Sequence, residues 1–102
     1  MNIYRQGDVL IIQVDELPDG GEPIARDNGN IVLAYGEVTG HRHAIADVNV
    51  QWIAAADSRY LVSDAPFTVR HEEHAPVAVP AGTFRVIRQR EYTPEAIRNV
   101  AD

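Results

Sequence analysis

The chain carries its only four histidines as two close pairs, and these are its most promising groups for chemistry. His41 and His43 lie in "TGHRHAI", and His71 and His74 lie in "VRHEEHAP". Residues two apart on a strand point to the same face, so His41 and His43 would offer two imidazoles to one metal ion. His71 and His74 are three apart, so they would converge only on a turn.

These groups predict a divalent metal site, with zinc as the first candidate. Four imidazoles make a tetrahedral set, whereas three with a carboxylate or water make an open site. The predicted ligands are His41, His43, His71 and His74. The carboxylates available as a ligand, a second-shell partner or a general base are Glu37, Asp47, Glu72 and Glu73, of which Glu72 and Glu73 are the catalytic candidates. Three other interpretations stay open: a site shared between subunits, a pH-sensitive interface, and surface histidines without a metal.

Composition excludes several other kinds of site. The chain has no cysteine and no lysine, which rules out disulfides, thiolate zinc sites and Schiff-base chemistry. The net charge of −6 argues against general nucleic-acid binding, which needs a basic surface. The arginine-rich stretch "FRVIRQREY" indicates a place for a small anionic ligand at Arg85 and Arg88, or else a stripe paired with acidic neighbours.

The length of 102 residues predicts one domain spanning the whole chain. No apolar run approaches the roughly 20 residues needed to cross a bilayer. The N-terminal apolar segment lacks the features of a signal peptide and is interpreted as a strand. We therefore expect no membrane contact and a cytoplasmic location.

Short runs rich in β-branched and aromatic residues alternate with turn signals, which predicts an all-β domain, either a small barrel or a sandwich. Residues 54–56 are compatible with a helical turn, and "YTPEAIRNVAD" has the cap and first-turn residues of a short helix over about 93–101. "DNGN" at 27–30 is a hairpin signal. The expected strands cover 8–14, 31–38, 59–63, 67–71, 77–82 and 83–92, and the segment 43–54 is expected to form one or two strands.

Two stretches resemble the motifs of cupins. "GHRHAIAD" is similar to the first cupin motif, with His41, His43 and Asp47 at the ligand positions and Asp in place of the usual Glu. "PAGTFRVIRQ" resembles the second, but Arg85 stands where a metal-binding His is expected. The resemblance implies a double-stranded β-helix barrel with a metal site in its mouth, in which His71 or His74 would have to replace the missing ligand.

A looser resemblance joins the segments "HRHAI", "HEEH" and "RQREYTPEAIRNVAD" to short uncharacterised bacterial and phage-encoded proteins. It implies a phage or mobile-element setting and assembly into homo-oligomers. Three functions follow as hypotheses: a β-protein with a mainly structural or ligand-binding metal site, a non-catalytic assembly protein with interface histidines, and a metal-dependent enzyme of cupin type acting on a small molecule.

Overall fold

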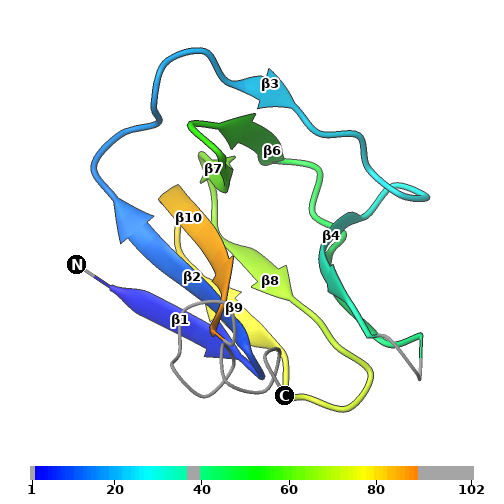
Figure 1. The fold of residues 1–102 in the computed structure, drawn as a ribbon. Coiled ribbons are helices and arrows are strands. Elements are labelled where there is room, and N and C mark those ends of the chain that lie inside the picture. Colours follow the sequence, from blue (N-terminus) through cyan, green and yellow to red (C-terminus); the bar gives the residue numbers. More distant parts are fainter. Residues whose placement is uncertain (1, 37–39, 90–102) are drawn as a thin grey trace, which may run out of the picture.

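The structure is a computed structural model that describes residues 2–36 and 40–89, and all of its regular elements are strands (Figure 1). This confirms the predicted all-β class. No helix in this part of the chain is long and apolar enough to cross a membrane. The predicted helix at 93–101 lies outside the described residues. The strands are β1 (Ile3–Gln6), β2 (Val9–Val14), β3 (Glu22–Pro23), β4 (Ile31–Tyr35), β5 (Arg42–Ile45), β6 (Val50–Ala55), β7 (Ser58–Ser63), β8 (Phe67–Val69), β9 (Val77–Val79) and β10 (Gly82–Arg88).

The strands form one large sheet and two small ones. The large sheet is antiparallel, with the order β1-β2-β10-β7-β6-β3, and the small sheets are the pairs β4–β5 and β8–β9. A bridge between Ala44 and Arg70 joins the two small sheets, because each residue donates its backbone N–H to the carbonyl of the other, at 2.9 and 2.8 Å. The sheets are not closed into a barrel, so the open, sandwich-like alternative fits the fold.

The core lies between the large sheet and the two small ones. Alternating residues of the large sheet turn inward, and Ile11 of β2 lies opposite Val86 of β10. The ring of Phe84, which has no exposed surface, packs edge-on against Tyr4 and Phe67 with centroids 6.0 and 5.9 Å away. Burial of this apolar surface is the main force that holds the layers together. The small sheets contribute Ile31, Leu33, Ile45, Phe67, Val69 and Val79.

One of the tight turns was predicted from the sequence, and others were not. Asn28 and Gly29 have φ values of 51° and 81°, which confirms the Asn-Gly hairpin signal at 27–30. The apolar N-terminal segment is two strands rather than one, because Gly7 with φ of 60° turns the chain between β1 and β2. The ambiguous residues near 54–56 lie in β6 and in the turn that joins it to β7.

Ala56 and Asp57 form that β6–β7 turn, and both have positive φ, 49° and 60°. A side chain at positive φ costs about 1–2 kcal/mol, and Asn-Gly is the preferred pair in such a turn. We expect Ala56→Asn with Asp57→Gly to raise the free energy of unfolding by about 1 kcal/mol, measured by urea denaturation. The reverse control is Gly29→Ala, where an added Cβ meets nothing within 4 Å, so that only backbone strain is tested. Gly29→Ala should lower the free energy of unfolding. Equal stability of the parent, the double variant and Gly29→Ala would show that positive φ causes no strain in these turns.

Candidate metal centre

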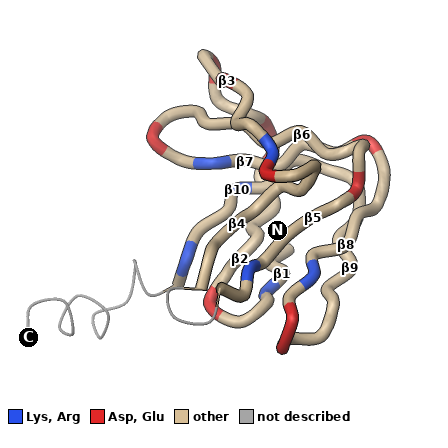
Figure 2. The backbone as a smooth tube through the Cα atoms, turned by 90° about the vertical axis from the view of Figure 1, so that its right-hand side faces the viewer, with Lys and Arg blue, Asp and Glu red and all other residues tan. Residues whose placement is uncertain are grey.

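Strand β5 lies beside β8 and the loop that follows it (Figure 2). The four histidines come from these two segments, and their rings lie close together. His43 lies within β5 and His41 just before it, while His71 and His74 lie on the loop from β8 to β9. His71 is central, because its ring centroid lies 4.4 Å from that of His43, 4.5 Å from His74 and 5.7 Å from His41. The Ala44–Arg70 bridge sets this arrangement, since it aligns the residues next to His43 and His71. Both predicted pairs thus meet within one chain.

Three donor groups lie close enough to share an ion. Ligand atoms of His41, His71 and Glu72 all fall within 4.8 Å of one another. Ligands about 2.1 Å from a tetrahedral zinc lie about 3.4 Å apart, so shifts of about 1 Å would close the group around an ion. Two predicted ligands, His43 and His74, adjoin this group but are not part of it.

The two glutamates of "HEEH" take different places. The Oε1 atom of Glu72 accepts the backbone N–H of Arg42 at 3.0 Å, and this hydrogen bond holds the pKa of the Glu72 carboxyl below its ordinary value. Glu72 is therefore ionised at neutral pH, as a metal ligand must be. The Oε1 atom of Glu73 lies 3.4 Å from Nδ1 of His41. In metal sites a carboxylate on one ring nitrogen orients an imidazole that binds the metal through its other nitrogen.

His43 is held by the buried side chain of Gln6. The amide nitrogen of Gln6 donates to the carbonyls of Val69 and Ala75, at 3.0 and 2.9 Å, so its Oε1 atom must act as an acceptor. Nδ1 of His43 lies 2.9 Å from that oxygen and therefore carries the proton. Neutral His43 consequently has its free lone pair on Nε2.

That Nε2 atom faces an ion pair at the β1–β2 turn. It lies 3.8 Å from Oδ1 of Asp8, whose Oδ2 accepts a hydrogen bond from Arg88 at 3.1 Å. Burial, and then the nearby His71, lower the pKa of His43 from 6.5 to about 4. The imidazole is therefore neutral at pH 7, with a lone pair that can accept a proton or a metal ion.

His71 closes the loop with its own ring. Its Nδ1 atom accepts the backbone N–H groups of Glu73 at 3.0 Å and His74 at 3.3 Å. The neutral ring then carries its proton on Nε2. A metal on Nε2 would require the proton to move to Nδ1, which would break both contacts to the backbone. An ion bound to His71 would therefore take over from these two contacts in holding the loop.

Gly7 lets the β1–β2 turn approach the histidines closely. A Cβ atom at this position would lie 2.9 Å from Nε2 of His74 and 3.2 Å from Cε1 of His43. Such contacts are closer than van der Waals packing allows, so a larger residue would displace the rings. The turn thus forms one wall of the cluster.

Comparison with known protein families identifies the family of this chain. The family described as "Domain of unknown function (DUF8820)" matches residues 5–89, which include both histidine pairs and all ten strands except the first two residues of β1. The chain belongs to the DUF8820 family. No curated protein and no solved structure matches it.

Several predicted site residues lie elsewhere in this DUF8820 domain. Oδ1 of Asp47 is 3.4 Å from the backbone nitrogen of Thr68, and Asp47 is not part of the group of donor atoms. Arg88 pairs with Asp8, and Arg85 lies in the middle of the large sheet opposite Ile12 and Tyr60. Neither arginine lines the cavity beside His71 and Glu72. Glu37 lies outside the described residues.

Four residues of the site were missed by sequence reasoning. Gln6 and Asp8 come from the β1–β2 turn, and no motif around them points to the histidines. Arg42 and Arg70 each precede a histidine, and they line the cavity next to the donor group. Strand alternation predicted that Arg42 lies on the face opposite His41 and His43. It could not predict that Arg42 lies near Arg70, because their proximity depends on the pairing of two distant segments.

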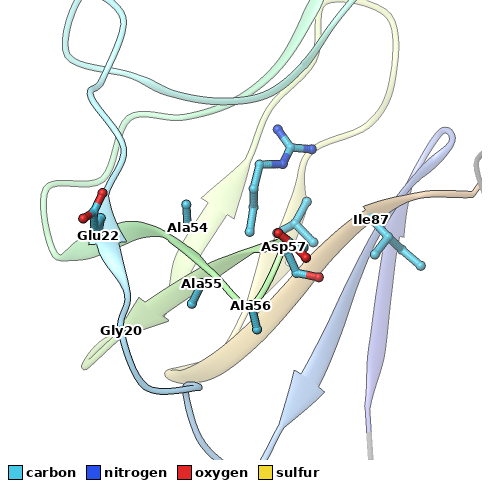
Figure 3. A pocket seen from close by; sticks show the side chains of 10 residues that line it. Gly20, Glu22, Ala54, Ala55, Ala56, Asp57 and Ile87 are labelled. Atoms are coloured by element: carbon cyan, nitrogen blue, oxygen red, sulfur yellow. The ribbon is translucent and has the colours of Figure 1, made fainter.

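Two larger cavities of the DUF8820 domain flank β3 and are lined by none of the histidines. One, of about 480 Å³, has Glu22 on one side and Asp57 of the β6–β7 turn and Ile87 of β10 on the other (Figure 3). The second, of about 580 Å³, is lined by apolar residues including Trp52 together with Arg26. The guanidinium group of Arg26 is already bound to the carbonyls of Gly29, Asp47 and Val50. Neither cavity has the paired donors of the histidine cluster.

Proposed function

We propose that this domain binds one divalent metal ion, with zinc as the first candidate, through His41, His71 and Glu72. The observation that carries the proposal is the approach of their ligand atoms to within 4.8 Å of one another. Two imidazoles and one carboxylate are a common ligand set for zinc with an open position. The three side chains come from two segments about 30 residues apart, so the fold, and not local sequence alone, assembles them.

Neighbouring groups support this choice of ligands. Glu73 lies against Nδ1 of His41, and the backbone N–H of Arg42 donates to Glu72. The ligands His41 and Glu72 are therefore each oriented by a neighbouring group. Nε2 of His43 has a lone pair and lies in the adjoining ring cluster. His43 and His74 adjoin the three ligands without joining them, which leaves the fourth coordination position open.

The ion would act mainly as a tether. It would tie the start of β5 to the β8–β9 loop, which are held together by the Ala44–Arg70 bridge and by Glu72. The apolar core is formed by other residues, so chelation should lower the melting temperature without abolishing the fold. Because Glu72 is exposed and both His41 and His71 are partly exposed, the fourth coordination position would face solvent and could take a ligand.

Metal content of the untagged protein tests the proposal. After incubation with Zn²⁺ and desalting, native mass spectrometry should show one ion per chain, and none in a His41→Ala/His71→Ala variant. Glu72→Gln should weaken affinity by about 10-fold or more, since the neutral amide is a poorer ligand. The matched control is Glu22→Gln, an exposed glutamate on β3 that should bind as the parent does.

Two results would count against the metal site. One is a parent protein that stays metal-free and whose melting temperature ignores both Zn²⁺ and chelator. The other is equal binding by the parent and the double-histidine variant, which would move the ion to another site.

Homo-oligomeric assembly is the second candidate function, and one observation favours it. Ile3 on the edge strand β1 and Tyr35 at the end of β4 keep 59% and 53% of their surfaces exposed. An unpaired strand edge with apolar side chains is a place for a second chain to add. A cytoplasmic location and a phage setting, both expected from the sequence, are compatible with such an assembly. Light scattering at several concentrations separates a stable oligomer from a monomer.

A further inference from the structure

A small cavity of about 270 Å³ adjoins the proposed metal site. It is lined by Arg42, Ala44, Arg70, His71 and Glu72. Two of these residues belong to the donor group, and two are arginines from neighbouring segments. The volume is below that of pockets for drug-sized molecules, so it suits a small ligand.

The pairing of β5 with the end of β8 places both arginines on this cavity. Ala44 lies opposite Arg70 in an antiparallel bridge, so their side chains share one face of the sheet. Arg42 is two residues before Ala44 and shares that face, whereas the side chain of His43 is buried on the other.

Neither arginine is held tightly by a carboxylate in the part of the chain that the structure describes. The guanidinium of Arg42 reaches Asp27 only at 3.9 Å, a weak ion pair. Arg70 is exposed, and within residues 2–36 and 40–89 its bonds are those of its backbone to Ala44. Glu72, the acidic residue of the cavity, accepts a backbone N–H and is a proposed metal ligand. The two arginines thus bring two positive charges to a cavity that has one acidic residue.

We infer that this cavity binds a small oxyanion, of carboxylate or phosphate type, between the metal ion and the two arginines. One oxygen would fill the open coordination position, and the others would meet the guanidinium groups of Arg42 and Arg70, whose planar donors match such anions. The inference rests on the proposed metal site, because the ion supplies the positive charge that outweighs Glu72. It moves the predicted anion contacts from Arg85 and Arg88 to Arg42 and Arg70.

Cobalt substitution tests the metal and the anion separately. The full-length protein is loaded with one equivalent of Co²⁺, whose visible absorption reports its ligands, and is titrated with acetate and with inorganic phosphate. Saturable changes in the spectrum are expected for at least one anion. Arg42→Gln and Arg70→Gln should each weaken anion binding by about 10-fold, while the cobalt spectrum without anion stays that of the parent. Arg5→Gln, at an exposed arginine of β1 outside the cavity, is the control for loss of charge.

The outcomes distinguish the two claims. Cobalt bands without any response to either anion would overturn the anion site and leave the metal site standing. An equal response in the parent and both arginine variants would show that the anion binds the metal alone. Absence of cobalt bands in the parent would refute the metal site and, with it, the anion site that depends on it.

Discussion

Replacing Gln6 by leucine should lower the free energy of unfolding by about 2–5 kcal/mol, one of the largest effects expected of any single polar side chain here. Gln6 is 3% exposed and has a hydrogen-bond partner at each end of its amide. Leucine has a similar volume but leaves the buried carbonyl of Val69 and the buried Nδ1–H of His43 without partners, while the part-buried carbonyl of Ala75 can bond to water. Each buried polar group left unpaired costs about 1–3 kcal/mol.

Urea denaturation of Gln6→Leu beside Gln51→Leu measures this effect. Gln51 is exposed on β6, so the same change there should alter stability by no more than about 0.5 kcal/mol. A loss below about 1 kcal/mol in Gln6→Leu would mean that the amide network contributes little. The variant also separates fold from site. The hydrogen bonds of Gln6 run to Val69, Ala75 and His43, none of which is a proposed metal ligand, so metal binding should persist in the folded fraction.

Local patterns were enough to predict the strands but not every turn. Alternation in β10 puts Phe84 and Val86 on one face, and both are buried in the core because side-chain period and burial are coupled along a strand. Asn28-Gly29 was found because its residue types match its positive φ values. Ala56-Asp57 was missed because neither residue favours positive φ. Val48, which lies within the segment 43–54 expected to be β-strand, is 93% exposed because β6 begins only at Val50.

The candidate site was predictable only in part, because its assembly depends on pairing between distant segments. The sequence predicted a metal site from the two histidine pairs, but it left open whether the pairs meet within one chain or between subunits. The pairing of Ala44 with Arg70 then determined which carboxylate joined them, and this is Glu72 rather than Asp47. The same pairing brought Arg42 and Arg70 together, which spacing along the chain could not show.

Acidification should destabilise the metal-free domain through His43, by about 1 kcal/mol at pH 5.5 and about 2–3 kcal/mol near pH 4. The cause is the lowered pKa of the folded-state imidazole, about 4 against 6.5 in the unfolded chain. Below pH 6.5 the unfolded chain takes up a proton that the folded chain does not accept. Stability therefore falls as pH drops from 6.5 to 4, and this contribution levels off below pH 4.

Urea titrations in the presence of a chelator, at several pH values between 7.5 and 5, measure this slope. His43→Asn should lose most of the slope, although its stability is lower throughout because the contact to Gln6 is altered. His74→Asn removes an exposed imidazole while leaving His43 intact, so it should keep the slope of the parent. If His43→Asn and the parent weaken in parallel between pH 6.5 and 5, the buried imidazole is not the source. The range from 6.5 to 5 is the informative one, because a carboxyl such as Glu72, whose folded-state pKa is lowered from 4.5, loses its contribution to stability mainly below pH 5.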